Sequence, residues 1–316
     1  MFLSPQLKNL YTILLRGRDQ GSCAARNPHV YLYAPVPALR FTLLTASRDR
    51  SCTGSRGPKH KESVMSQISL VGAGPGPLEL LTLRALQRLE AAEVVVYDRL
   101  VGEEILTRIP QGAARFDVGK RCGEPSPSQV QINALLLALA RTGKRVVRLK
   151  GGDPLVFGRG GEEALHLARH GIAAELVPGI TAALGCAASS LIPLTHRGLA
   201  RSLTLVTGHL MDEGDYQGWQ GLTRAGHTLV FYMGLERAAE IRQGLLAAGA
   251  SPDLLVALVV AGCSARQQVH ETRLDGLAQA AGALLGQSPV LMIMGEVVRL
   301  RAELQGLLGQ ALDRVA

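Results

Sequence analysis

The sequence predicts an α/β protein with mainly parallel sheets, and three observations support this fold class. Short apolar runs such as Val94-Val-Val-Tyr97 alternate with longer segments that have apolar residues at helical spacing. This alternation is typical of parallel sheets layered with helices. Hydrophobic residues make up 47% of the chain and aromatic residues only 4%, which favours an Ala/Leu/Val-rich core. Several predicted strands also end in glycine-rich loops.

Length and composition exclude several classes of protein. The 316 residues are enough for one large or two ordinary domains. No apolar run approaches the roughly 18 residues that a membrane-spanning helix needs, so we expect no membrane association. The five cysteines are odd in number and form no C-x-x-C pair, which indicates neither a zinc site nor a disulfide framework. We therefore expect a reducing, cytoplasmic location.

The basic charge is concentrated at the start of the chain. Residues 1–64 hold ten Lys/Arg against three Asp/Glu, so the rest of the chain carries only about +1 of the net +8. Global basicity therefore gives no support to a nucleic-acid partner. Residues 1–64 show no sustained periodicity, and we expect a disordered extension, either an organelle leader or a start site placed upstream of Met65. We exclude this extension from the fold.

The first half of the chain predicts one α/β domain, residues 65–178. Ser128 and Gln131 have the spacing of a capping box, which marks the start of one helix. The strands are expected at 68–71, 94–97, 114–118, 145–149 and 174–177, and the helices at 78–91, 128–143 and 161–170.

The second half predicts another α/β domain, residues 179–305, followed by a tail, 306–316. It begins with a helix of unusually small residues, 180–190, which we expect to bridge the two domains and to let a backbone or a ligand come close. Strands are expected at 202–207, 228–232, 254–260, 268–272 and 290–294, and helices at 235–248 and 274–285.

The loop between Arg148 and Gly161 is the strongest local signal. It contains five glycines together with Asp153 and Arg159, between a predicted strand and a predicted helix. Glycine loses the most backbone freedom on folding, so such a loop usually exists to let a ligand approach the backbone. In open α/β sheets that place is the carboxyl end of the strands. An ordinary turn with solvated charges is the alternative.

Charged residues end three successive predicted strands. These residues are Asp98, Lys120 and Asp153. Because the carboxyl ends of parallel strands share one edge of a sheet, the three side chains are expected to converge on one cleft. Asp98 would serve there as a general base and Lys120 as a general acid. The alternative is that each is a solvated loop charge.

Other chemistries find little support. Pro75 and Pro77 interrupt the G-x-G-x-x-G pattern of dinucleotide-binding folds, so an NAD site is rejected. His166 and His170 have the spacing of a metal pair but lack further ligands, and Glu162 and Glu163 are expected to lie at a helix start, where acidic residues are favourable. We therefore predict no metal. No Ser/His/Asp or Cys/His arrangement indicates a covalent nucleophile.

Eight motifs in order resemble the tetrapyrrole (precorrin) methylase family over about residues 66–300. They are Val71-Gly-Ala-Gly-Pro-Gly76, Tyr97-Asp-Arg-Leu-Val101, Val118-Gly-Lys-Arg121, Arg148-Leu-Lys-Gly-Gly-Asp-Pro154, Phe157-Gly-Arg-Gly-Gly-Glu-Glu163, Val177-Pro-Gly-Ile-Thr-Ala182, Ile192-Pro-Leu-Thr-His-Arg197 and Phe231-Tyr-Met-Gly234. Each motif alone is a weak signal, whereas eight in order are a strong one.

The resemblance implies a homodimer of two α/β domains that binds S-adenosylmethionine in the cleft between them. It implies methylation of uroporphyrinogen III at C2 and C7, giving precorrin-2, with Asp98 as proton acceptor and Lys120 as proton donor. The implied cofactor-binding residues are Pro75, Gly151, Gly152, Asp153, Val156, Thr181, Ala182, Met233 and Gly262.

The tetrapyrrole substrate carries eight carboxylates, so arginines near the cleft are candidates to bind it, because guanidinium pairs with carboxylate in bidentate fashion. These candidates are Arg99, Arg121, Arg148, Arg159, Arg197 and Arg201. The chain departs from the family pattern at Pro77, where Asp is usual, at Pro125, where His is usual, and at Cys263, where Thr is common.

Three other functions remain open. A later precorrin methylase would not be expected to share the Tyr-Asp-Arg-Leu-Val and Gly-Lys-Arg motifs. A relative that methylates RNA ribose would have a basic core, and this core is nearly neutral. An inactive binding protein would not need Asp98 and Lys120. The two-module relatives carry an NAD-dependent domain upstream, which residues 1–64 are too short to supply, so we expect a monofunctional enzyme. Whether its product leads to sirohaem, cobalamin or haem d1 is open.

Overall fold

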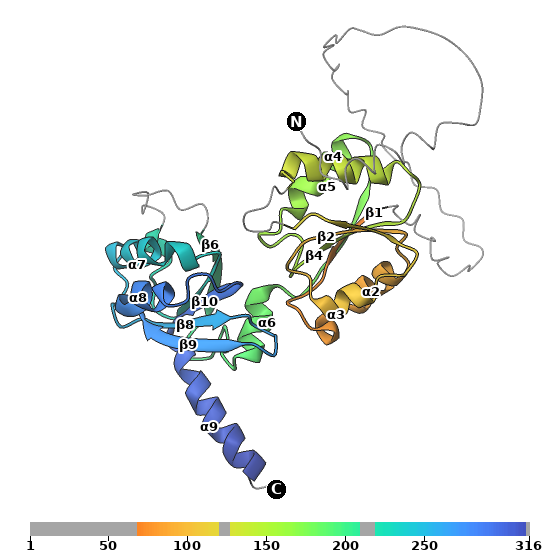
Figure 1. Cartoon of the computed structure of the whole chain (residues 1–316). Helices are drawn as coiled ribbons and strands as arrows, with labels where there is room; N and C mark the ends of the chain where they lie inside the picture. The colour runs from red at the N-terminus through yellow and green to blue at the C-terminus, as the bar shows by residue number, and fades with distance from the viewer. Residues whose placement is uncertain (1–67, 120–126, 209–218, 314–316) are drawn as a thin grey trace, which may run out of the picture. The chain divides into compact units, whose positions relative to one another are not determined.

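The computed structural model describes residues 68–119, 127–208 and 219–313. The chain divides between Met65 and Ser66, and every described residue belongs to the second unit, Ser66–Ala316. Two five-stranded sheets with helices packed on them form this unit (Figure 1). The predicted α/β fold class is therefore confirmed.

The first sheet is entirely parallel. Its order is β3 (Ala114–Asp117), β2 (Val94–Tyr97), β4 (Val146–Lys150), β1 (Ile68–Gly72) and β5 (Ala174–Val177). Helices α2 (Leu83–Glu90) and α3 (Glu103–Thr107) cover one face, and α4 (Gln129–Ala140) and α5 (Gly160–Arg169) cover the other (Figure 1). The central strands are nearly continuous apolar runs, as expected for strands buried on both faces.

Side chains of β4 alternate between the two helical layers. Val147 and Leu149 join the apolar cluster with Ala85 and Leu89 of α2. Arg148 and Lys150 point to the opposite face, since successive strand residues alternate. There they are buried beneath α5. The sheet therefore carries two buried cations on its α5 side.

Helix starts follow local sequence signals closely. Ser128 and Gln131 form the predicted capping box at the start of α4, in which each side chain accepts the other residue's backbone N–H. The helix predicted over 78–91 is interrupted, because Thr82 caps α2 through its side chain after a separate 3-10 turn, Leu78–Leu80. The short helix α3 was not predicted.

The second sheet is mixed, which corrects the expectation of a mainly parallel arrangement. Its order is β6 (Ser202–Thr207), β7 (His227–Tyr232), β10 (Val290–Met294), β8 (Leu255–Val260) and β9 (Gln268–Arg273). Only β6 and β7 are parallel, and the other pairs are antiparallel. Residues 261–267 between β8 and β9 are too few for the crossover that parallel strands need, so they form a hairpin.

Helices cover both faces of the second sheet as well. Helices α7 (Ala238–Ala247) and α8 (Leu277–Gly282) pack on one face, around Phe231, Leu258 and Met292. Helix α6 (Ala182–Ser189) packs on the other face, where Ala183, Cys186 and Ala187 contact the sheet. All strands of the first sheet precede residue 178 and all strands of the second follow residue 201. The domain boundary at 178 stays a prediction.

A long helix ends the described chain. A 3-10 turn, Glu296–Arg299, leads into α9 (Leu300–Asp313), which runs through the region for which we expected only a tail (Figure 1). Its Leu307 and Leu308 are exposed, so the apolar periodicity there does not mark a core helix. In the part of the chain that the structure describes, no helix is long and apolar enough to cross a membrane.

Three loops meet backbone to backbone at the carboxyl edge of the first sheet. Beyond β1 and β4, Gly74 and Gly152 exchange backbone hydrogen bonds of 3.1 and 2.7 Å. A methyl group added at Gly72 would lie 2.5 Å from the Gly179 nitrogen and 2.7 Å from the Gly152 oxygen. The chain leaves β1 toward β2 and leaves β4 toward β5, in opposite directions across the sheet. This is the switch point where open α/β sheets bind ligands.

Replacing Gly72 with alanine should destabilise the protein by about 1–3 kcal/mol, because the added methyl overpacks backbone atoms that cannot rotate away. Denaturant unfolding of the full chain measures this change. Gly112→Ala is the matched control, since a methyl group there meets nothing within 4 Å, and its effect should stay within about 0.5 kcal/mol. Equal stability of the two variants would contradict the assigned contact.

Candidate functional site

Asp153 holds two of the three loops together. Its Oδ2 accepts the Gly179 N–H at 3.1 Å, and its Oδ1 accepts the Leu155 N–H at 2.8 Å. The carboxylate therefore ties the loop after β4 to the loop after β5. Next to it, Gly152 has φ +68°, a conformation that side-chain-bearing residues rarely adopt. A methyl group added at Gly152 would point toward Thr181 and Ala182, 3.8 Å from the Thr181 Cα and the Ala182 nitrogen.

Tyr232 connects the end of β7 to the start of α6. Its hydroxyl lies 2.7 Å from the Thr181 Oγ1 and accepts the Ala183 N–H at 2.9 Å. Its ring lies against that of Phe157, with centroids 4.9 Å apart. Burial raises the pKa of Tyr232, so the hydroxyl stays protonated. Tyr232 therefore links the glycine loop after β4, the helix α6 and the adjoining Met233.

Two further loops pack closely against the small residues of α6. A methyl group added at Gly185 would lie 2.6 Å from the Pro75 Cγ. One added at Gly262, in the turn after β8, would collide with the Cys186 sulfur. The expectation that small side chains let another backbone come close is therefore confirmed for this helix.

All nine predicted cofactor-binding residues thus lie around α6. Pro75, Gly152, Thr181, Ala182 and Gly262 meet the helix directly or belong to its start. Gly151 and Asp153 flank Gly152, while Val156 and Met233 adjoin the Phe157–Tyr232 ring pair. Their roles stay predictions, but the structure brings them together.

Backbone strain is concentrated in the same place. Among the described residues, six other than glycine have φ between 47° and 63°. One of them, Met233, is a predicted cofactor-binding residue, and three more, Phe157, Ala261 and Cys263, adjoin such residues. Each such conformation costs about 1–3 kcal/mol and persists only where its surroundings impose it. Clusters of this kind are typical of ligand sites.

Asp98 lies at the rim of a network of buried charges. Its Oδ1 is 3.4 Å from the Gly151 nitrogen, and its Oδ2 is 3.4 Å from an Arg148 nitrogen. About a quarter of its side chain is exposed, at 26%, so the carboxylate remains open to a ligand. Arg148 thus anchors the carboxylate from beneath.

Glu163 neutralises this network from α5. Its Oε1 accepts hydrogen bonds from Lys150 at 3.0 Å and from Arg148 at 3.3 Å, and the side chain is fully buried. Burial, and then the neighbouring Arg148 charge, lower the pKa of Lys150. Glu162 and Glu163 lie in the first turn of α5, as predicted, and the structure adds that Glu163 pairs with the two β4 cations.

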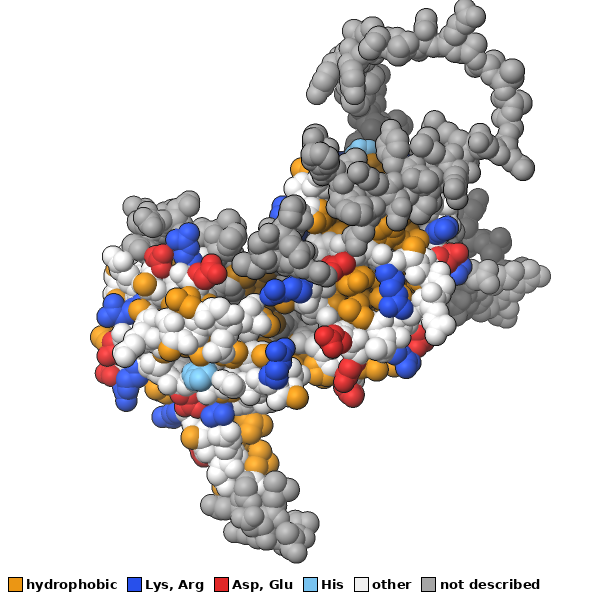
Figure 2. Space-filling model, viewed as in Figure 1, with side chains coloured by type: hydrophobic (Ala, Val, Ile, Leu, Met, Phe, Trp, Pro, Cys, Tyr) orange, Lys and Arg blue, Asp and Glu red, His pale blue; other side chains and the backbone are white. Residues whose placement is uncertain are grey.

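The predicted substrate arginines fall into different environments. Arg148 is buried and paired with Glu163 and Asp98, so it does not fit the prediction that it binds a substrate carboxylate. Arg159 is exposed and paired with Glu162. Arg99, Arg197 and Arg201 are exposed. Lys120 and Arg121 lie outside the described residues. On the face shown in Figure 2, cationic and anionic side chains are interspersed.

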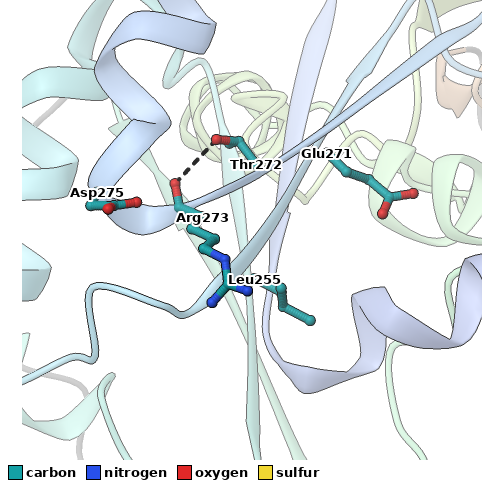
Figure 3. A pocket seen from close by; sticks show the side chains of 5 residues that line it. All are labelled: Leu255, Glu271, Thr272, Arg273 and Asp275. Atoms are coloured by element: carbon teal, nitrogen blue, oxygen red, sulfur yellow. Dashed lines mark hydrogen bonds between the residues drawn. The ribbon is translucent and has the colours of Figure 1, made fainter.

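Two other features of the described residues, the predicted histidine pair and a hollow beside β9, give no evidence of a binding site. In the described residues, no group of three or more His, Cys, Asp or Glu side chains is placed to hold a metal. The His166 and His170 rings lie 4.5 Å apart. A hollow of about 390 Å³ lies beside β9 (Figure 3). Its Arg273 and Glu271 are paired with Asp253 and Arg301, so their charges are already engaged.

The sequence matches a family model over most of its described length. The model describes tetrapyrrole (corrin/porphyrin) methylases and matches residues 67–278. The chain belongs to this family.

Several relatives of this tetrapyrrole methylase are similar in sequence and structure. The chain is 52% identical to the sirohaem synthase of Edwardsiella ictaluri, over 75% of this chain and 51% of that protein. It is 52% identical to sirohaem synthase 2 of Serratia proteamaculans, over 78% of this chain and 52% of that protein. The chain therefore spans about half the length of these relatives.

One solved structure is covered by the match over almost its whole length. It is the uroporphyrin-III C-methyl transferase of Thermus thermophilus complexed with S-adenosyl homocysteine. The match has a TM-score of 0.63 and 43% identity, and covers 74% of this chain and 99% of that one.

Tyr232, Lys150 and Glu163 contact predicted site residues or their immediate neighbours, and sequence reasoning did not predict these contacts. All three lie within quoted motifs, so their positions were visible but their roles were not. Tyr232 resembles an ordinary strand residue, and Glu163 an ordinary helix start. Their partners lie between 13 and 51 residues away in the chain, which periodicity does not reveal.

Replacing Glu163 with glutamine should destabilise this methylase by about 3–5 kcal/mol, because it leaves two buried cations without their counter-charge. Denaturant unfolding at neutral pH measures the loss. Glu162→Gln is the matched control, since its exposed pair with Arg159 should contribute about 0–1 kcal/mol. A Glu163 variant as stable as the Glu162 variant would refute the network.

Proposed function

We propose that this chain is a uroporphyrinogen-III C-methyltransferase that transfers methyl groups from S-adenosylmethionine to C2 and C7, giving precorrin-2. The observation that carries the proposal is the 43% identity to the Thermus thermophilus enzyme over 99% of that enzyme's length. The convergence of the nine predicted cofactor-binding residues around α6 supports it further. The sirohaem synthases among the relatives favour sirohaem as the destination of the product.

The residues around α6 fit S-adenosylmethionine. An added methyl group at Gly152 would be in contact with the Thr181 Cα and the Ala182 nitrogen, so the absence of a side chain leaves the backbone of this loop facing the start of α6. Polar backbone groups and small side chains suit a ligand that combines an adenosine with an amino acid. When bound there, the cofactor supplies an electrophilic methyl group.

The residues of the chain then orient the substrates and accept or donate protons. A pyrrole ring that gains a methyl at carbon becomes cationic and must lose a proton. The Asp98 carboxylate, at the rim of the sheet edge and anchored by Arg148 and Gly151, is our proposed acceptor. Lys120 remains the proposed proton donor. The exposed Arg99, Arg197 and Arg201 are proposed to pair with substrate carboxylates. Orientation of two large substrates supplies most of the remaining rate enhancement.

The family resemblance also leads us to propose a cytoplasmic homodimer. Light scattering on the full chain measures the subunit number. A monomer at micromolar concentration would contradict this part of the proposal and leave the reaction itself untouched.

Anaerobic incubation of the full chain with S-adenosylmethionine and uroporphyrinogen III should add two methyl groups to the tetrapyrrole. Mass spectrometry of the product counts them. Unmodified uroporphyrinogen with the cofactor still bound would overturn the proposed acceptor, and absence of cofactor binding would overturn the proposed reaction class.

Asp98→Asn should lower kcat by roughly 10²–10⁴-fold, the usual contribution of a general base. Its affinity for S-adenosylmethionine should be unchanged, because asparagine keeps the Oδ1 that accepts the Gly151 N–H and Asp98 is not among the predicted cofactor-binding residues. Asp253→Asn is the control, since its carboxylate is exposed and pairs only with Arg273. Turnover of the Asp98 variant at the wild-type rate would remove its assigned role.

Gly152→Val should abolish binding of S-adenosylmethionine, because the side chain would be strained and would fill the space facing Thr181 and Ala182. Calorimetric titration measures the affinity. Gly143→Val is the matched control, as Gly143 has a similar φ of +76° with nothing within 4 Å of an added methyl. Both variants carry backbone strain, so equal affinities would refute the placement of the cofactor.

A further inference from the structure

Two cysteines from distant segments lie close together next to Gly262 and Pro75, two of the proposed cofactor-binding residues. Cys186 belongs to α6, and Cys263 belongs to the turn between β8 and β9. The Cys263 sulfur also lies 3.5 Å from the Ser189 hydroxyl oxygen of α6. A methyl group added at Gly185 would lie 2.9 Å from the Cys263 sulfur, and one added at Gly262 would collide with the Cys186 sulfur. The two backbones are therefore already packed together at this point.

A glutamine holds Cys263 against α6. The Gln267 Oε1 accepts the Cys263 N–H at 2.7 Å and the Ser189 hydroxyl at 2.6 Å, while its Nε2 donates to the Ser189 carbonyl at 3.0 Å. Cys263 itself has φ +63°, a strained conformation that these bonds maintain. These hydrogen bonds hold the turn that carries Cys263 against α6, which carries Cys186, so the fold keeps the two thiols next to each other.

The two thiols differ in access and acidity. Cys186 is buried, whereas Cys263 is partly exposed. The neighbouring Cys186 thiol lowers the pKa of Cys263 to about 6, and the neighbouring Cys263 together with burial raises the pKa of Cys186. Thiolate is the reactive form of cysteine. Cys263 is therefore the thiol that meets a reagent first, with Cys186 beside it.

We propose that Cys263 and Cys186 form a reactive thiol pair that is oxidised to a disulfide by low-molecular-weight disulfides of the glutathione class. The Cys263 thiolate attacks one sulfur of the reagent, forms a mixed disulfide and releases one small thiolate. Cys186 then loses its proton to solvent, attacks the Cys263 sulfur and displaces the second small thiolate. Two protein thiols are oxidised, and one small disulfide is reduced to two thiols.

The disulfide should weaken cofactor binding, a consequence that rests on the proposed function. A sulfur–sulfur bond of about 2.05 Å is shorter than any contact between thiols that are only hydrogen-bonded. Closing this bond must draw the turn between β8 and β9 toward α6. Gly262 in that turn already packs tightly against Cys186 of the helix. Gly262 is a proposed cofactor contact, so its displacement should lower affinity. Since coupling between two sites is reciprocal, bound cofactor should in turn slow the oxidation.

The chemical step can be tested without any assay of methylation. The full chain carrying Cys23→Ser, Cys52→Ser and Cys122→Ser retains only this pair and is treated with oxidised glutathione, then digested without reduction. We expect a peptide cross-link between Cys186 and Cys263 and loss of both free thiols. In the same background, Cys186→Ala should stop at one glutathione on Cys263, and Cys263→Ala should react far more slowly. Free thiols at both positions, or a mixed disulfide that persists in the pair, would overturn the proposal.

The coupling is tested separately, by titrating S-adenosyl homocysteine into the reduced and the oxidised pair. We expect oxidation to weaken binding by about tenfold, within the usual range of coupling between sites, and dithiothreitol to restore it. The Cys263→Ala protein is the control, with equal affinity before and after glutathione treatment. If the disulfide forms but affinity is unchanged, the coupling is refuted while the thiol pair stands. If even the reduced protein binds no S-adenosyl homocysteine, it is the proposed function that fails.

Discussion

The close approach of backbone at the ends of β1, β4 and β5 is the constraint on which the rest of the site depends. Gly72, Gly152 and Gly179 lie so near one another that a side chain at Gly72 or Gly179 would collide with the main chain. Parallel strands at a switch point send their loops in opposite directions, which opens a crevice between them. Here that crevice is held at a fixed width by the Gly74–Gly152 hydrogen bonds and by Asp153. Glycine is required where backbone must meet backbone.

Helix α6 connects these loops to the second sheet. Its own side chains are small, so they bring little packing volume, and the helix instead lets Pro75 and Gly262 come close. Tyr232 adds a directional contact by binding Thr181 and Ala183 at the start of the helix. A helix fixed by close backbone contacts and one buried hydroxyl is sensitive to small displacements of its neighbours. That sensitivity is the physical basis for the proposed coupling between the Cys186–Cys263 pair and ligand binding.

Local signals in the sequence predicted local structure well. The strands Val94–Tyr97 and Ala174–Val177 and the capping box at Ser128 correspond to the observed elements, because periodicity and capping act over a few residues. The sequence failed to predict features that depend on contacts between segments far apart in the chain. The strands of the second half were recognised, yet their direction depends on β10 pairing antiparallel to both β7 and β8. Glu163 was correctly predicted at a helix start, but its contact with Lys150 was not, because Lys150 lies on a strand that meets the helix only after folding.

The sequence by itself determined the α/β class, the order of elements and the family, since these follow from short-range patterns and from eight motifs in order. It also identified the glycine loop and Asp98, because strand ends in a parallel sheet share one edge. Only the tertiary structure decided which charges are buried, that Arg148 supports Asp98 from within the core, and that Tyr232 and Cys263 both meet α6. The reason is physical. Burial and partnership depend on which surfaces face each other after folding, and residues far apart in the chain, such as Ser189 and Gln267 at a separation of 78 positions, become neighbours only then.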